Sequence, residues 1–246
     1  MSGSSTAIIL AAGVGKRFGG ALADLPKGLL EVGGESLLGR LLRQLRAAGV
    51  GRATIVVGHG GDRVVEALSG ASDATALEFV HNPDYRRGAI LSLWCARERL
   101  SGPAIVMDAD VWGPDAMIAR LVSSPHESCF LLDGRSESTG EEQMLMVRDG
   151  RVLDIARRPR GTWDLLGESI GFLKLSGEAA RTLRHLLGVR VGRGEVDLEH
   201  EEVYPDLLRR VPIGFERADD LDWTEIDFPA DLERARSFAA KAARGT

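Results

Sequence analysis

Residues 6–19 read TAIILAAGVGKRFG, a short apolar run followed at once by a glycine-rich turn that carries two cations. The run Thr6–Leu10 predicts a strand buried on both faces, because it is short and almost entirely apolar. The glycines of the turn leave backbone N–H groups open to a polyphosphate, whose charge Lys16 and Arg17 would offset. The stretch therefore indicates a phosphate-binding turn directly after the first strand.

This turn differs from the two common phosphate-binding glycine motifs. The Walker A pattern fails because Leu10 stands where its leading glycine belongs, and Arg17 follows Lys16 where Ser or Thr should stand. The dinucleotide-binding fingerprint fails because Phe18 replaces its third glycine. A Rossmann dehydrogenase is therefore a poor candidate, whereas a simple glycine loop with no ligand stays open.

Short apolar runs alternate with amphipathic segments through the first half of the chain. The predicted strands are Thr6–Leu10, Ala53–Val57, Leu77–Val80 and Ala104–Met107. The predicted helices are the leucine-rich segment from a Ser36 cap to a stop at Gly49, then Asp62–Leu68 and Ile90–Leu100. This order predicts an α/β fold with a mostly parallel sheet flanked by helices, in which ligands bind at the carboxyl ends of the strands.

The second half predicts a small antiparallel extension. Its strands are Cys129–Leu132, Gln143–Val147, Val152–Ala156 and Ile170–Leu173, and the turn Asp149-Gly150 joins two of them. Helices are predicted at Ala179–Leu187, at Glu201–Leu208 and from Pro229, the last with a buried stripe of Leu232, Ala235 and Phe238. Without a repeat or a linker, residues 1–246 are expected to form a single domain.

Composition excludes several classes of protein. The chain has 246 residues, of which 31 are Lys or Arg and 36 are Asp or Glu, so its formal net charge of -5 creates no general attraction for nucleic acid or anionic membranes. The sequence contains no run of about 18 consecutive apolar residues, which is the length that a membrane-spanning helix needs. Cys95 and Cys129 form no disulfide framework or zinc motif, which favours a cytoplasmic protein. None of the five histidines lies in a metal-binding pattern, so no histidine is assigned to the site.

The glycine turn continues into Leu25–Leu30, LPKGLL, then VGG at 32–34 and two leucines. Residues 8–38 thereby resemble the signature of the nucleotidyltransferase superfamily that activates sugar phosphates, phosphocholine and related compounds, LAAGxGxR, a variable loop and PKxLxxxxGxxL. The resemblance implies a Rossmann-like, nucleotide-diphospho-sugar-transferase-like fold. It implies that Lys27 and Arg17 are catalytic, although a lysine after proline could equally be a solvated charge. The implied nucleotide-binding residues are Leu10, Ala11, Ala12, Gly13, Gly15, Lys16, Arg17 and Lys27.

Two acidic segments are candidate metal sites. Asp108 and Asp110 close an apolar strand, where carboxylates can hold Mg²⁺ together with substrate phosphates, or simply cap a turn. Residues 223–227, WTEID, precede the last helix, where acidic side chains also favour the helix dipole. The family resemblance implies that Asp110 and Asp227 bind the metal. Asp108 would assist through water, and it is also an acceptor-binding candidate.

Two further segments extend the resemblance: residues 82–93, and residues 167–172, GESIGF, which resemble a segment that lines the acceptor pocket. Residues 82–93 follow the spacing NPxYxxGxxxSL of a base-recognition segment, which implies that Gly88 and Ser92 contact the nucleotide, although Ser92 could be a buried hydroxyl. Gly88-Ala89 replaces the Asn-Asn of many choline-type members, which weakens the inference of that acceptor. The acceptor-binding candidates are Asp108, Glu168, Lys174, Trp223 and Glu225, with Arg158 as a further cation for the acceptor phosphate.

These residues predict a Mg²⁺-dependent nucleotidyltransferase that moves CMP from CTP to a small phosphorylated or phosphonate acceptor. Residues 5–122 would bind the nucleotide, and residues 123–246 would bind the acceptor and end in the last helix. Phosphocholine, 2-aminoethylphosphonate, an inositol phosphate and a sugar phosphate all stay open as acceptors, and a homodimer is possible. The alternatives are a sugar-1-phosphate uridylyl- or guanylyltransferase and a catalytically silent nucleotide-binding regulator.

Overall fold

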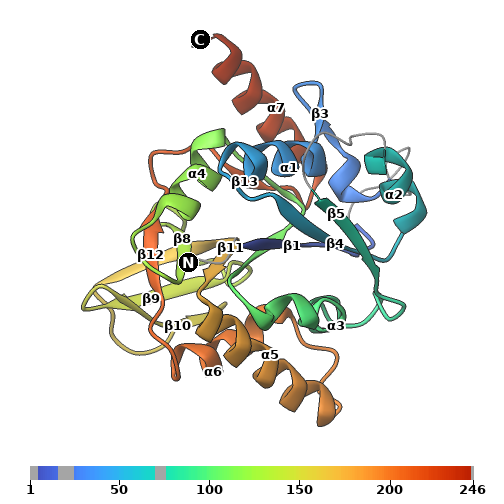
Figure 1. Cartoon of the computed structure of the whole chain (residues 1–246). Helices are drawn as coiled ribbons and strands as arrows, with labels where there is room; N and C mark the ends of the chain where they lie inside the picture. The colour runs from blue at the N-terminus through green and yellow to red at the C-terminus, as the bar shows by residue number, and fades with distance from the viewer. Residues whose placement is uncertain (1–4, 16–24, 70–75, 245–246) are drawn as a thin grey trace.

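A nine-stranded sheet runs through the protein, which we describe from a computed structural model over residues 5–15, 25–69 and 76–244. Four neighbouring strands lie parallel in the order β6-β1-β4-β5 (Figure 1). This arrangement confirms the mostly parallel central sheet expected from the sequence. The bounds of these strands are β1 Thr6–Ala11, β4 Arg52–Val57, β5 Ala76–His81 and β6 Ala104–Asp108.

The antiparallel extension is built around one long strand, β11 Leu165–Leu175, which pairs with β6, β8 and β9. It is longer than the predicted Ile170–Leu173. Asp149 (φ 51°) and Gly150 (φ 72°) form the predicted turn between β9 and β10, since consecutive positive φ angles are typical of tight hairpins. The remaining strands of the sheet are β8 Cys129–Asp133, β9 Met144–Arg148, β10 Arg151–Ala156 and β12 Gly214–Arg217.

Helices cover both faces of the sheet (Figure 1). Side chains alternate along β1, so Ala7 and Ile9 pack towards α1, α2 and α4, whereas Ile8 packs towards α3, α5 and α6. Within the described residues, no helix is both long and apolar enough to cross a membrane. The helices are α1 Leu37–Ala47, α2 Gly61–Ser69, α3 Ile90–Cys95, α4 Asp115–Ser123, α5 Gly177–Gly192 and α6 Tyr204–Leu208.

The last helix, α7 Pro229–Arg244, packs on a small separate apolar cluster beside the sheet. Trp112 and Phe238 stack there with ring centroids 6.0 Å apart. Buried Leu232 and Ala235 confirm the apolar stripe expected for this helix. Two short strand pairs complete the region: β2 Glu31–Val32 with β3 Glu35–Ser36, and β7 Val111–Trp112 with β13 Thr224–Glu225.

Two predicted helices are wrong in detail. The segment Ile90–Leu100 divides into α3 and the 3-10 helix η3, Arg97–Ser101. The Trp94 carbonyl accepts from the Arg97 guanidinium at 2.9 Å and from the Ala96 N–H, and so it does not take part in a continued α-helical hydrogen-bond pattern. The segment predicted from Glu201 begins as the 3-10 helix η4, His200–Val203, and becomes α6 only at Tyr204. Pro205, which has no N–H to donate, stands in the first turn of α6. A third 3-10 helix, η2, spans Lys27–Leu29.

Candidate active site

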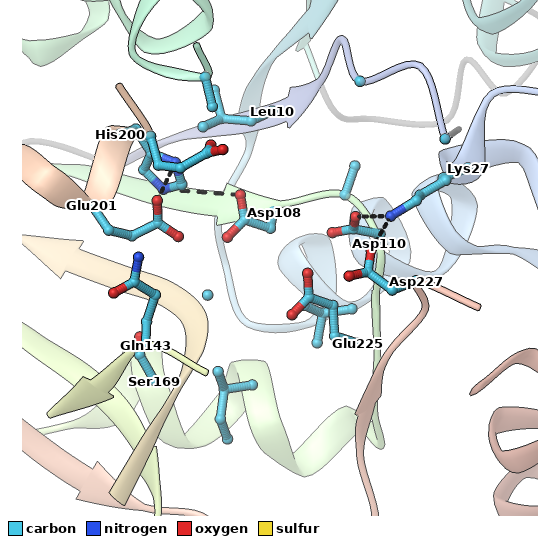
Figure 2. Close-up of a pocket in the computed structure, with 18 of the residues that line it drawn as sticks. Leu10, Lys27, Asp108, Asp110, Gln143, Ser169, His200, Glu201, Glu225 and Asp227 are labelled. Atoms are coloured by element: carbon cyan, nitrogen blue, oxygen red, sulfur yellow. Dashed lines mark hydrogen bonds and ion pairs between the residues drawn. The ribbon is translucent and has the colours of Figure 1, made fainter. Parts of the chain in front are cut away.

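A pocket of about 860 Å³ opens at the carboxyl ends of β1 and β6. The glycine turn lines it on one side, and segments from β11, η4 and the β13–α7 connection line the others. Figure 2 shows Lys27, Asp110 and Asp227 together at one end, His200 and Glu201 at the other, and Asp108 between the two groups. The pocket therefore lies where the topology of the sheet predicts a ligand site.

Backbone pairing brings the two distant acidic segments together. In β6, Asp108 is in register with Leu10 of β1, which places Asp110 just beyond the end of the strand. The Ile226 N–H donates to the Asp110 carbonyl at 2.9 Å, and β13 pairs with β7. These bonds fix Asp227 beside Asp110 across more than a hundred residues of sequence.

Lys27 lies between these two carboxylates. Its Nζ donates to Asp110 Oδ2 at 2.9 Å and to Asp227 Oδ1 at 2.5 Å. Burial by itself lowers the pKa of Lys27, but the charge of Asp110 and the hydrogen bond to Asp227 outweigh it, so the pKa is raised. Lys27 is therefore a fixed positive charge at the end of the pocket next to the glycine turn.

Asp110, Glu225 and Asp227 form an all-oxygen cluster suited to a hard cation. One carboxylate oxygen of each lies within 4.8 Å of the others, and the Lys27 ammonium already sits against two of them as a stand-in cation. Oxygen donors of this kind fit Mg²⁺. Burial and the charges of Asp110 and Asp227 raise the pKa of Glu225 to about 8. Glu225 was expected on the acceptor side, but the structure groups it with the metal candidates.

The glycine turn lines the pocket from Leu10 to Gly15. Gly15 has φ +61°, and a Cβ there would lie 3.3 Å from Lys27 Cγ, so glycine permits the turn to pack against the lysine. Lys16 and Arg17 lie outside the described residues, and their contacts with phosphate stay predictions.

Of the two base-recognition candidates, Ser92 lines the pocket and Gly88 does not. The Ser92 Oγ accepts a hydrogen bond from Asn82 Nδ2 at 3.0 Å. Gly88 is buried away from the pocket lining, where a Cβ would collide with the backbone of Leu198. Gly88 therefore has a packing role, because it lets the segment before η4 approach α3 closely.

Asp108, Glu168 and Trp223 line the pocket, and their contact with an acceptor stays a prediction. Burial, followed by the charge of Glu201, raises the pKa of Asp108 well above its usual value. Burial also raises the pKa of Glu168. The indole Nε1 of Trp223 donates to Asp133 Oδ2 at 2.7 Å, which fixes the ring at the pocket wall.

Two expected cations lie elsewhere. Lys174 Nζ donates to the Ser124 carbonyl at 2.8 Å and to the Val122 carbonyl at 3.4 Å, so it satisfies carbonyls at the end of α4 and not a substrate phosphate. Arg158 is exposed outside the lining, whereas its neighbour Arg157 lines the pocket. The sequence did not distinguish the two because no motif covers this segment.

Sequence reasoning missed a group of polar residues at the far end of the pocket. His200 and Glu201 come from η4, and Gln143 precedes β9. His200 Nδ1 lies 3.0 Å from Glu201 Oε2, and its Nε2 lies 3.9 Å from Asp108 Oδ1. No local spacing signals this group, since its members meet only through the fold.

Residues 7–157 match the family model described as the MobA-like NTP transferase domain. This match covers more than half of the chain. The chain belongs to the MobA-like NTP transferase family. Its glycine turn, Lys27 and Asp110 all lie inside the matched region, whereas Asp227 lies beyond it.

Curated relatives of this NTP transferase domain extend over nearly the whole chain. It is 29% identical to a "Bifunctional IPC transferase and DIPP synthase" of Thermococcus kodakarensis, covering 98% of this chain and 52% of the relative. It is also 29% identical to a "CMP-5'-(3-aminopropyl)phosphonate synthase" of Streptomyces rubellomurinus, covering 93% of this chain and 38% of the relative. The chain thus spans about half, or less, of the length of these relatives.

The fold of the NTP transferase domain also occurs among solved structures. The CTP:phosphocholine cytidylyltransferase of Streptococcus pneumoniae superposes with a TM-score of 0.77 at 21% identity, covering 95% of this chain and 98% of that one. This likeness confirms the expected fold class.

Proposed function

We propose that this protein is a cytidylyltransferase that moves CMP from CTP to a small phosphonate or phosphorylated acceptor and releases pyrophosphate. The observation that carries the proposal is the contact of Lys27 with Asp110 and Asp227 beside the glycine turn. A site that only binds nucleotide has no need of this combination. A relative whose name specifies a CMP-phosphonate product supports CTP and a phosphonate acceptor.

In the proposed reaction, an oxygen of the acceptor attacks the α-phosphorus of CTP and forms the new P–O bond. The bond between the α-phosphorus and the bridging oxygen breaks, and pyrophosphate leaves with that oxygen. Because the attacking oxygen is already anionic, no general base is required. Catalysis then depends on alignment of the reactants and on fixed charges around the phosphates.

The residues of this chain supply that environment. The N–H groups from Leu10 to Gly15 bind the triphosphate, and Lys27 stabilises negative charge that develops on it. Asp110 and Asp227, with Glu225 alongside, would hold Mg²⁺, which would neutralise the phosphates and orient them. Ser92, which lines the same pocket, would contact the base.

Two alternatives share much of this site. A sugar-1-phosphate uridylyl- or guanylyltransferase would use the same turn, lysine and carboxylates, and would differ in base and acceptor. A silent nucleotide-binding regulator would bind nucleotide without turnover. The retained Lys27, Asp110 and Asp227 favour an active enzyme over the regulator.

The test is pyrophosphate release with Mg²⁺, crossing CTP, UTP, GTP, ATP and dTTP with phosphocholine, 2-aminoethylphosphonate, inositol phosphate and sugar phosphates. We expect acceptor-dependent release with CTP. Release with UTP or GTP and a sugar phosphate would favour the first alternative, and binding without release would favour the second. Asp110→Ala should keep the fold, seen by circular dichroism, and lose activity to below about a hundredth of wild type.

Removal of divalent metal provides a separate prediction. After chelation and dialysis the protein should release no pyrophosphate, and added Mg²⁺ should restore the rate, because the acidic cluster needs a cation to bind the triphosphate. Full activity in excess chelator would contradict the metal role of Asp110 and Asp227.

A further inference from the structure

The far end of the pocket contains a second polar cluster, formed by Asp108, His200 and Glu201. One ligand atom of each lies within 4.8 Å of the others (Figure 2). Asp108 comes from the end of β6, and the other two come from η4. The cluster is separate from Lys27, Asp110 and Asp227, but the segment 108–110 connects the two.

His200 presents an unused nitrogen to this end of the pocket. Its side chain is 5% exposed, and Nδ1 lies 3.0 Å from Glu201 Oε2. Nε2 has no hydrogen-bond partner among the described residues, and Asp108 Oδ1 at 3.9 Å is beyond hydrogen-bonding distance. A neutral imidazole that carries its proton on Nδ1, beside Glu201, leaves Nε2 as an acceptor facing Asp108 Oδ1, an arrangement that suits a donor placed between them.

Tyr204 is a second unsatisfied group at the same place. Within the described part of the chain, its buried hydroxyl has no hydrogen-bond partner, and its ring meets His200 edge-on with centroids 5.5 Å apart. Burial raises the pKa of Tyr204, and the charges of Glu201 and Asp108 raise it further. Tyr204 does not itself line the pocket, so it supports the cluster from behind His200, where its buried hydroxyl is an exception to the usual pairing of buried polar groups.

The spacing selects the kind of partner. An ammonium nitrogen about 2.8 Å from both His200 Nε2 and Asp108 Oδ1 would form an angle of roughly 90° between them. Two of its N–H bonds can point in these directions. A metal ion about 2.1 Å from both atoms would have a ligand–metal–ligand angle of roughly 140°, far from tetrahedral or octahedral angles. A hydroxyl has one hydrogen to donate to several acceptors, whereas a primary ammonium has three and also neutralises the carboxylates.

We propose that Asp108, His200 and Glu201 form a subsite for a primary ammonium group of the acceptor. The acceptor is then a short aminoalkyl phosphonate or phosphate and not a polyol or sugar phosphate. Its length is limited because the ammonium binds next to Asp108 and the phosphorus reacts next to Asp110, two residues along the chain. This inference rests on the proposed function.

The decisive comparison uses 2-aminoethylphosphonate and 2-hydroxyethylphosphonate, which differ in the terminal group alone. With CTP and Mg²⁺, we expect kcat/KM for the amine to exceed that for the alcohol by about a hundredfold or more, because the alcohol leaves buried acceptors unpaired. Calorimetry with each phosphonate in the presence of a non-hydrolysable CTP analogue measures the same preference without turnover. Equal or better use and binding of the alcohol, or of inositol phosphate, would overturn the subsite.

Substitutions test which side chains produce the preference for the amine acceptor. Glu201→Gln keeps the shape but removes the charge, and it should raise KM for the amine about tenfold or more while changing the alcohol little. Tyr204→Phe should reduce the amine preference in the same direction. The matched control is Glu127→Gln, an exposed carboxylate outside the pocket lining, which should change neither substrate. An equal loss for both acceptors in Glu201→Gln would indicate a structural role and contradict the subsite.

The outcomes separate this inference from the proposed function. Pyrophosphate release without amine preference upholds cytidylyl transfer and overturns the subsite. Amine-selective binding without release upholds the subsite and overturns the transfer. Stoichiometric Zn²⁺ or Mn²⁺ binding that Glu201→Gln abolishes would assign the cluster to a metal and overturn the ammonium.

Discussion

Lys27 is the residue on which the proposed chemistry most directly depends. It lies on η2, a short turn fixed by the Leu29 N–H donating to the Pro26 carbonyl at 2.8 Å, and it faces two carboxylates from distant parts of the chain. Its ammonium offsets their charge before any substrate binds. In the proposed reaction the same charge is available to the triphosphate of the substrate.

Lys27→Met removes this charge and keeps most of the side-chain volume. We expect kcat to fall about a hundredfold or more, because a fixed charge at developing phosphate charge is typically worth that much. Steady-state kinetics of pyrophosphate release provide the measurement. Lys241→Met is the matched control, since Lys241 forms an exposed ion pair with Asp222 outside the pocket lining. A rate within threefold of wild type for Lys27→Met would contradict the role.

Glu225 predicts a pH effect on stability in metal-free protein. Its pKa rises from 4.5 to about 8 on folding, so the folded form retains a proton that the unfolded chain releases. The free energy of unfolding should therefore decrease as pH rises through that window, and Glu225→Gln should gain stability relative to wild type over it. Glu225 is exposed to solvent at the pocket, and solvent screening keeps the slope well below the limit of about 1.4 kcal/mol per pH unit.

Urea denaturation in chelator at about pH 5, 6.5 and 8 measures this slope for wild type and Glu225→Gln. Parallel stability curves for the two proteins would contradict the raised pKa.

At the scale of the elements, the irregularity in β11 shapes the pocket wall. The register of β11 with β8 shifts between Ser169 and Leu173, and Gly171 inside this shift has φ +76°. A Cβ at Gly171 would lie 2.6 Å from Asp108 Oδ2. Glycine therefore lets the strand bend past the carboxylate, and the bend gives residues 168–171 their place in the pocket.

Gly171→Ala should destabilise the protein by about 1–3 kcal/mol and displace Asp108, with a marked rise in KM for the acceptor. Gly150→Ala is the control, because Gly150 also has positive φ (72°) but has open space around its Cβ position. Gly150→Ala should lose stability because of its positive φ, but its KM for the acceptor should stay unchanged. Denaturation and acceptor titration of both variants test the distinction, and identical behaviour would contradict it.

At the scale of the whole molecule, α7 packs against the segment that carries Asp227. Leu232 and Ala235 pack with Val32, Trp112 and Ile226 in the small third cluster. Ile226 directly precedes Asp227, so the burial of this helix holds the carboxylate in place. The metal candidates consequently depend on packing that lies outside the main core.

Leu232→Ala should cost about 2–5 kcal/mol of stability, as expected for a buried leucine. It should also raise the Mg²⁺ concentration needed for half-maximal activity, because Asp227 loses its support. Leu68→Ala in α2 is equally buried in the main core and should cost similar stability without the change in Mg²⁺ dependence. A similar Mg²⁺ requirement in both variants would contradict the claim that the packing of α7 holds Asp227 in place.

The sequence by itself determined the parallel sheet and the glycine turn after β1, and its resemblance to the nucleotidyltransferase superfamily singled out Lys27, Asp110 and Asp227. The sheet and the turn depend on local patterns of apolar residues and glycines, and the resemblance depends on short ordered motifs, all of which lie within a few positions of one another. The tertiary structure alone decided that Glu225 joins the metal candidates, that Lys174 and Gly88 point elsewhere, and that His200 and Glu201 meet Asp108. Such placements arise from strand register and packing between distant segments, and no local spacing encodes them.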